Sequence, residues 1–255
     1  MKEFVNAIVE EESGLALFAV GQAGYIIKSQ SGQLLGIDLY LSECVERVEG
    51  HIGFKRLLPK ILNPLDLVFD VIIATHPHYD HFDVDSIPLL MSNEKTYLYA
   101  SLNCAEEVQR LNMKSEKISY VKAGDSDQYG DFGLEFVNCD HGTGAPDAFG
   151  VIISVDGKRI YMSGDTCLRL DRVDEILARG LLDVLIAPIN GAFGNMNEIE
   201  CAELSNALKP RLTIPSHYGM FASHGGNPGV FVNIMNKKFP DNQYILMAMG
   251  EKIIL

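Results

Sequence analysis

The chain has 255 residues and a formal net charge of −13 at pH 7. This acidic balance opposes non-specific binding to nucleic acid, which depends on clustered lysine and arginine releasing counterions from phosphates. No apolar run approaches the roughly 20 residues that span a bilayer, and the first residues lack the basic start and apolar centre of a signal peptide. With 47% hydrophobic residues the chain can bury a large core. We therefore expect one domain over residues 1–255, with no nucleic-acid or membrane partner.

Five cysteines are spread along the chain, and none of them forms a Cys-x-x-Cys pair. An odd number cannot be fully paired within one chain, which favours a reducing compartment, so we expect a cytoplasmic protein. Cys167 lies two residues after Asp165. We assign it no role, because a free cysteine is more often a small buried hydrophobe.

Apolar runs rich in β-branched and aromatic residues, separated by turn-forming residues, are typical of strands. They predict strands at residues 15–20, 25–29, 34–38, 71–75, 96–100, 118–121, 134–137, 151–155, 159–163, 184–189, 212–215 and 244–249. The first three are separated by short glycine-containing turns and are expected to form a meander.

Other segments have apolar residues three or four positions apart, which is the helical period. They predict helices at residues 84–91, 105–111, 172–179, 199–208 and 230–237. Strands followed by helices, twice over, favour an α/β fold with two packed sheets and helices outside. Residues 51–67 are the least regular stretch, and they form a candidate lid.

One short motif carries most of the chemical information. The sequence Thr-His-Pro-His-Tyr-Asp-His at residues 75–81 directly follows an apolar strand, and it places His76, His78, Asp80 and His81 within six residues. Each polar group buried without a partner costs roughly 1–3 kcal/mol, so folding alone does not explain this density. Imidazoles with a few carboxylates suit divalent zinc, manganese or iron. The motif therefore predicts a metal site where the strand ends.

Three further candidates follow apolar, strand-like runs elsewhere in the chain. They are His141, the aspartate of Gly-Asp-Thr at Asp165, and the histidine of Pro-Ser-His-Tyr-Gly at His217. Their repeated placement at strand ends favours a common site with the first motif.

The combination His-x-His-x-Asp-His, a downstream histidine, Gly-Asp-Thr and a final strand-end histidine resembles the metallo-β-lactamase superfamily. Within it, the chain is similar to the branch of L-ascorbate-6-phosphate lactonases and related metal-dependent hydrolases. The details are an aspartate two residues past His81 and the sequences Phe-Gly-Val-Ile-Ile at 149–153 and Ala-Pro-Ile-Asn-Gly at 187–191. The resemblance implies a four-layer α/β/β/α sandwich with the metal site at one edge of the two sheets. It also suggests that identical chains assemble into an oligomer.

The resemblance further implies a set of ligands for two divalent ions, zinc or manganese first and iron as an alternative. His76, His78 and His141 would hold one ion; Asp80, His81 and His217 would hold the other; and Asp165 would bridge them. For Asp80 two roles stay open, because it could be a ligand or could act as a base that orients the nucleophile.

A pair of ions lowers the pKa of water toward neutrality and polarises a substrate oxygen, so hydrolysis is the natural reaction. The ligands specify the nucleophile and leave the electrophile open, whether carbonyl carbon or phosphorus. The leading hypothesis is a lactonase-like hydrolase of a small anionic or phosphorylated molecule. A metal-dependent phosphodiesterase is the alternative; di-iron redox chemistry and a non-catalytic metal-binding module are more remote.

Residues around the ligands are assigned more loosely. Asp83 could accept the N–H of a ligand imidazole, or could cap a helix. Asp38 ends a strand. In the family this position is usually followed by proline and lies near the metals; Leu39 stands in place of the proline here, and we assign Asp38 to substrate binding. Asn190 and Tyr218 lie at strand ends and could donate to a substrate oxygen.

Two positively charged or titratable residues complete the list of candidates. Arg56, in the candidate lid, is expected to grip a substrate phosphate, because a guanidinium suits a bidentate contact. His224 lies in a glycine-rich loop and could bind substrate, but a lone loop histidine is more often solvated.

Overall fold

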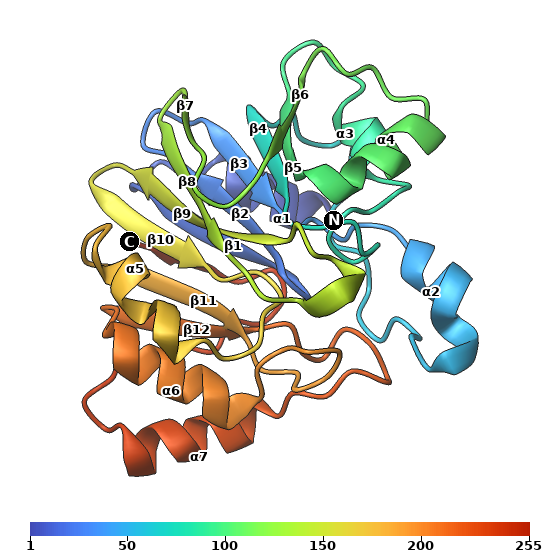
Figure 1. Ribbon diagram of the computed structural model, residues 1–255. Helices are drawn as coiled ribbons and strands as arrows, with labels where there is room; N and C mark the ends of the chain where they lie inside the picture. The colour runs from blue at the N-terminus through green and yellow to red at the C-terminus, as the bar shows by residue number, and fades with distance from the viewer.

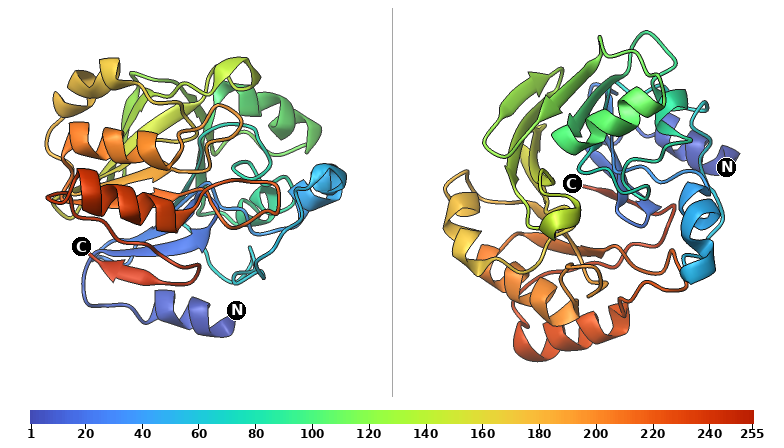
Figure 2. Two further views of the ribbon diagram at one scale, coloured as in Figure 1. Left: turned by 90° about the horizontal axis from the view of Figure 1, so that it is seen from below. Right: turned by 45° about the vertical axis from the view of Figure 1, so that its right-hand side comes forward.

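The computed structural model describes residues 1–255 and arranges them in four layers (Figures 1 and 2). A seven-stranded sheet has the order β13-β1-β2-β3-β4-β5-β6. A six-stranded sheet, with the order β12-β11-β10-β9-β8-β7, packs against it. The first sheet comprises β1 (Ala16–Gly21), β2 (Gly24–Lys28), β3 (Leu34–Ile37), β4 (Val71–Ala74), β5 (Tyr97–Ser101), β6 (Ile118–Val121) and β13 (Lys252–Ile254). The second comprises β7 (Ser126–Tyr129), β8 (Phe132–Asn138), β9 (Phe149–Val155), β10 (Lys158–Met162), β11 (Val184–Pro188) and β12 (Leu212–Ser216).

Helices cover the outer face of each sheet, which confirms the expected α/β/β/α sandwich. The helix α1 (Lys2–Val9) lies beneath β1 and β2, whereas α6 (Glu198–Leu208) and α7 (Pro228–Lys238) lie on the far side of the other sheet (Figure 2). The shorter helices are α2 (Cys44–Glu49), α3 (Ile87–Leu90), α4 (Ala105–Arg110) and α5 (Val173–Leu177).

The strand sequences explain this layering, because strands buried on both faces are apolar throughout. In β1, Leu17 and Ala19 belong to the core between the sheets, while Phe18 and Val20 belong to the core under the outer helices. A third apolar cluster joins the six-stranded sheet to α5, α6 and α7. The burial of both faces therefore follows directly from the continuous apolar runs.

The strand directions bring the candidate side chains to one edge. Strands β3, β4 and β5 run parallel, as do β10, β11 and β12, and β8 has the same direction because β9 pairs antiparallel with both β8 and β10. The carboxyl ends of parallel strands meet at one edge of a sheet. The residues that follow these ends include Asp38 after β3, the residues 75–81 after β4, His141 after β8, Asp165 after β10, and His217 after β12.

Most predicted strands and helices are present within one to three residues, but the predicted strand at 244–249 is wrong. Only Tyr244 forms an isolated bridge, with Thr213, and the edge strand β13 follows it at Lys252–Ile254. Four elements had no prediction, namely α1, α2, β7 and β13. They are short, and β7 in particular exposes most of its side chains, so none carries a long apolar period.

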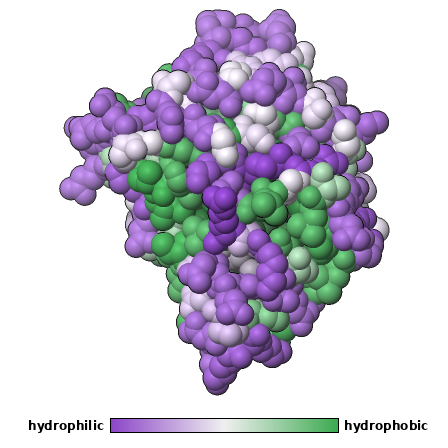
Figure 3. Space-filling model, turned by 90° about the vertical axis from the view of Figure 1, so that its left-hand side faces the viewer, coloured by the Kyte–Doolittle hydropathy of each residue, from purple (hydrophilic) through white to green (hydrophobic).

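No helix has the length and apolar character needed to cross a membrane. On the face shown in Figure 3, hydrophobic surface gathers in patches with hydrophilic side chains between them. The assembly of identical chains stays a prediction.

Candidate metal centre

The segment after β4 folds into a tight turn that projects its polar side chains into the sheet edge. The backbone N–H groups of His81 and Phe82 both donate to the carbonyl oxygen of His78. Phe82 is fully buried in the core under the outer helices, which anchors the turn. His76 is also fully buried, while His78 remains partly exposed.

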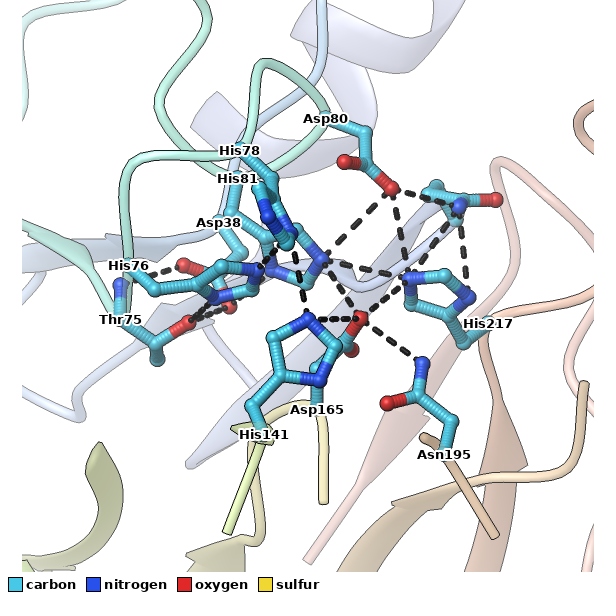
Figure 4. A network of polar contacts seen from close by, with 12 residues as sticks. Asp38, Thr75, His76, His78, Asp80, His81, His141, Asp165, Asn195 and His217 are labelled. Carbon is cyan, nitrogen blue, oxygen red and sulfur yellow. Dashed lines mark hydrogen bonds and ion pairs between the residues drawn. The ribbon is translucent and has the colours of Figure 1, made fainter. Parts of the chain in front are cut away.

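Three imidazoles from this turn and from the loop after β8 converge on one point (Figure 4). Nδ1 of His78 lies 2.9 Å from Nε2 of His76 and 3.1 Å from Nε2 of His141. Nε2 of His141 also lies 3.8 Å from Oδ2 of Asp165. These four side chains form the first donor group.

A second donor group lies on the other side of the same Asp165 oxygen (Figure 4). Nε2 of His217 is 3.1 Å from Oδ2 of Asp165, 3.3 Å from Oδ2 of Asp80 and 3.2 Å from Nε2 of His81. Nε2 of His81 is 3.4 Å from Oδ2 of Asp165 and 3.6 Å from Oδ2 of Asp80. These five separations all lie between 3.1 and 3.6 Å.

The spacing of these atoms fits divalent ions. Metal–nitrogen and metal–oxygen bonds of about 2.0–2.2 Å in a tetrahedron separate the ligand atoms by about 3.4 Å, close to the distances in the second group. Each neutral imidazole offers one unprotonated nitrogen, and three such nitrogens that face one another cannot all be satisfied by hydrogen bonds among themselves. The seven side chains that the sequence singled out are therefore brought together as two donor sets that share Asp165.

A buried carboxylate fixes the orientation of two of these imidazoles. Asp38 accepts hydrogen bonds from the backbone N–H and the hydroxyl of Thr75, each at 2.8 Å, and its Oδ2 lies 2.8 Å from Nδ1 of His81. The Thr75 hydroxyl oxygen in turn lies 3.0 Å from Nδ1 of His76. Both imidazoles therefore direct Nε2 into the donor groups, as expected of hydrogen-bonded metal ligands.

The placement of Asp38 corrects its assignment to the substrate. Its side chain is fully buried beneath His81, so it does not reach the cavity. Its backbone has a φ of +47°, a left-handed conformation that aspartate and asparagine tolerate better than most residues. Leu39 in place of proline does not prevent this turn.

Two amide side chains that sequence reasoning missed also contact the donor groups. Nδ2 of Asn195 donates to Oδ2 of Asp165 at 2.8 Å, and Nε2 of Gln22 donates to Oδ2 of Asp80 at 2.8 Å. Gln22 also lies 3.2 Å from Nδ1 of His224, so His224 belongs to the site and is not merely solvated. Gln22 lies in the tight turn between β1 and β2, and no motif in the sequence marks it as part of the site. Its burial, which only the structure shows, points to this role.

The histidines of the two donor groups have pKa values shifted in opposite directions. Burial alone would lower the pKa values of His81 and His217. The facing carboxylates, Asp165 foremost, outweigh burial and raise the pKa of His81 well above its usual range and the pKa of His217 to about 9. Burial itself lowers the pKa of His76 well below its usual range and that of His141 to about 4. For Asp165, burial is outweighed by His217 and His81, which hold its pKa well below the usual range.

A cavity of about 350 Å³ opens onto both donor groups. His78, Asp80, His141, Asp165 and His217 lie along it together with Asn195 and His224. The remaining wall is largely apolar and includes Val45, Ile52, Phe54 and Phe193. No lysine or arginine lines the cavity, and Glu49 does.

The expected phosphate contact of Arg56 is corrected by this geometry. Nε of Arg56 donates to the carbonyl oxygen of Leu58, and one terminal nitrogen donates to that of Ser42, both at 2.8 Å. The guanidinium also lies over the ring of Tyr40, 4.7 Å from its centroid. Arg56 thus ties the irregular segment to the loop after β3 and does not line the cavity.

Asn190 and Tyr218 do not line the cavity either. Tyr218 borders a different hollow, with Tyr25 and Met249. Asn190 is buried and neither atom of its side-chain amide has a partner in the protein. The loops after β11 and β12 therefore turn these two side chains away from the donor groups, which strand-end position alone could not reveal.

Asp83 accepts no hydrogen bond from an imidazole, so its expected contact with a ligand histidine is corrected. Its carboxylate accepts hydrogen bonds from the backbone N–H groups of Leu41 and Ser42 and from the hydroxyls of Ser42 and Ser86. It also accepts from the backbone N–H of Ser86 at the start of α3. Asp83 thus binds the backbone of the turn that leads into α3, whose N-cap is Ser86, and it also holds two loops together.

Comparison with known proteins places this arrangement in a family. The beta-lactamase superfamily domain matches residues 44–218. The chain belongs to this superfamily. It is 30% identical over 184 residues to a metal-dependent hydrolase from Sulfurisphaera tokodaii, a match that covers 71% of this chain and 79% of that relative. The chain is thus a metal-dependent hydrolase of the metallo-β-lactamase superfamily.

Solved structures share the fold. A metallo hydrolase from the archaeon Ignicoccus hospitalis superposes with a TM-score of 0.72 at 20% identity, covering 94% of this chain and 97% of the other. An isothiocyanate hydrolase from Delia radicum gut bacteria superposes with a TM-score of 0.73 at 19% identity, covering 94% and 99%. Both confirm the four-layer architecture.

The two buried aspartates lead to opposite expectations on substitution. Asp38→Asn keeps a residue that tolerates the left-handed turn but presents an amide to His81, so metal affinity should fall about 10–100-fold. Asp83→Asn should leave metal affinity unchanged and lower the free energy of unfolding by about 1–3 kcal/mol, because buried donors lose their acceptor. Metal titration and urea unfolding of both variants check this pair. Equal metal affinities of Asp38→Asn and wild type would contradict the role given to Asp38.

Metal binding should release protons near neutral pH. In chelator-treated protein the facing carboxylates raise the pKa of His217 to about 9 and that of His81 well above its usual range. This favours the protonated form of both, and each must lose its proton to ligate an ion. Calorimetric titrations at pH 7 in buffers of different ionisation enthalpy should show close to two protons released per chain, and fewer above pH 9. A binding enthalpy that is independent of the buffer at pH 7 would refute this.

Proposed function

We propose that the protein hydrolyses a small, uncharged cyclic ester, a lactone. In this proposal, His76, His78 and His141 hold one divalent ion, zinc or manganese before iron. Asp80, His81 and His217 hold a second ion, and Asp165 bridges the two. Such ions, when bound, lower the pKa of water and polarise a carbonyl oxygen.

The observation that carries the proposal is that both donor groups border one cavity. His78 and His141 of the first group and Asp80 and His217 of the second line it, and Asp165 lies at their boundary. A substrate carbonyl in this space would therefore lie against both donor groups at once. The cavity is at the lower end of volumes typical for small-molecule sites, which favours a compact substrate.

The reaction needs a carrier for one proton. The attacking water loses one proton as its oxygen bonds to the carbonyl carbon, the ring carbon–oxygen bond breaks, and the ring oxygen takes up that proton to leave as an alcohol. Asp80 is suited to move this proton, because its carboxylate lines the cavity and only Oδ2 is engaged by Gln22, His81 and His217. Its Oδ1 is the atom we assign to the proton.

The lining of the cavity favours an uncharged substrate over a phosphorylated one. Lys55 and Lys60, the other cations of the irregular segment, pair with Glu46 and Glu43. Together with the engagement of Arg56, this leaves no side chain to grip a phosphate beyond the donor groups, and Glu49 would repel one. The same absence of cations argues against a phosphodiesterase.

A substrate panel tests the proposal. Holoprotein should open γ-butyrolactone-type substrates with a kcat/KM at least about tenfold above that for a phosphorylated lactone or a bis-aryl phosphodiester, because a hydrogen-bonded charge contributes roughly 1.5–3 kcal/mol and the cavity supplies no such contact. An isothiocyanate belongs in the same panel, because one protein that shares the fold is an isothiocyanate hydrolase.

Asp165→Ala serves as the inactive control, and its lactone turnover should fall to background. Preferential turnover of the phosphodiester by wild-type protein would overturn the proposal in favour of the phosphodiesterase. Preference for the phosphorylated lactone would restore the anionic substrate class.

A further inference from the structure

Three rings from distant segments meet at the cavity. Phe54, which follows α2, has its ring centroid 5.6 Å from that of Phe193 in the loop after β11. The imidazole of His224 lies 5.1 Å from the ring of Phe54 and 5.5 Å from that of Phe193. All three residues line the cavity next to the donor groups.

Phe193 is unusual in two independent respects. Its side chain is 61% exposed, although a phenylalanine ring is among the groups most favoured by burial. Its backbone has a φ of +56°, within the short turn Gly191 to Gly194. A bulky residue in this left-handed region is strained, and such strain collects at binding and catalytic sites. Core packing explains neither feature, because the ring points away from the core.

The other two rings form a fixed base for Phe193. Phe54 is only 9% exposed and packs with its edge against Phe221, whose ring centroid is 5.7 Å away. His224 packs against the same Phe221 at 5.2 Å and is held on its other side by Gln22. Of the three rings, Phe193 is therefore the one that exposes most of its surface to a bound molecule.

The apolar surface continues along the mouth of the cavity. Ile52, in the short turn before Phe54, is 61% exposed and lines the same space. Glu49 is the charged residue on this wall, and it disfavours anions. The mouth thus offers aromatic and aliphatic contacts, and it offers no cationic side chain that would bind a carboxylate or a phosphate.

We propose that Phe54 and Phe193, whose rings contact each other, form one aromatic wall, here called the clamp, against which a planar, apolar substituent of the substrate packs. The substrate class is then uncharged aryl-substituted esters and lactones. This inference rests on the proposed hydrolase function and names its substrate class. Aromatic rings prefer offset or edge-to-face contacts with centroids about 4.5–7 Å apart, and the clamp offers both a ring edge and an exposed ring face. The ester group would then lie against the donor groups.

Matched lactones test the clamp by activity. We compare γ-phenyl-γ-butyrolactone with γ-methyl-γ-butyrolactone in wild type, Phe193→Ala and Phe193→Leu. The phenyl compound should have a kcat/KM about tenfold above that of the methyl compound in wild type, and Phe193→Ala should abolish most of this ratio. Phe193→Leu should retain an intermediate ratio, because it keeps apolar area and loses the ring face.

A control variant and a binding measurement complete the experiment. Leu181 is 78% exposed and precedes β11, at the opposite end of the sheet, so Leu181→Ala should match wild type. Binding of 5-phenyl-2-pyrrolidinone, a lactam that resists opening, is measured calorimetrically against that of 5-methyl-2-pyrrolidinone on the holoprotein. The phenyl lactam should bind about tenfold more tightly, and Phe193→Ala should remove the difference.

The two readouts separate the failure of the clamp from the failure of the proposed function. If wild type opens no lactone but binds the phenyl lactam preferentially through Phe193, the clamp stands and the lactonase proposal fails. If both lactams bind equally, or if Phe193→Ala behaves like Leu181→Ala, the clamp is overturned whatever the activity.

Discussion

A single carboxylate oxygen, Oδ2 of Asp165, connects the two halves of the site. It lies within 3.8 Å of the Nε2 atoms of His141, His81 and His217 and accepts a hydrogen bond from Asn195. Asp165 is 5% exposed, and ionised groups at such depth require compensating charge. Because the charge of Asp165 needs these partners, the strand ends of both sheets must place nitrogen donors around the same oxygen.

The second constraint is orientation, which Asp38 supplies from beneath. One carboxylate holds His81 directly and His76 through the hydroxyl of Thr75. Because Asp38 follows β3 and Thr75 follows β4, the parallel pairing of these strands fixes the contact. The register of β3 and β4 therefore fixes the orientation of the His81 and His76 imidazoles. In this way the packing of the sheet determines the geometry of the site.

The sequence predicted the layers and the donor set because both depend on strong local signals. Continuous apolar runs specify strands buried on two faces, and the residues 75–81 bring four polar groups to one turn. Contacts made by loops were not predictable in the same way. The sequence positions of Arg56 and Tyr218 favoured substrate binding. The directions of their side chains depend on how the loops pack, and this packing places both outside the cavity. Gln22 and Phe193 lie in turns without a motif, and both have a left-handed backbone. Only the structure shows that Gln22 is buried against Asp80 and that Phe193 is exposed at the cavity.

The central claim is that the seven side chains hold two divalent ions around Asp165. The most direct test is the metal content of protein purified without added metal, measured by elemental mass spectrometry together with native mass spectrometry of the intact chain. The account predicts two ions per chain. One ion per chain, which stays at one after incubation with excess zinc or manganese and removal of unbound metal, would contradict the shared role of Asp165 and would reduce part of the donor set to supporting contacts.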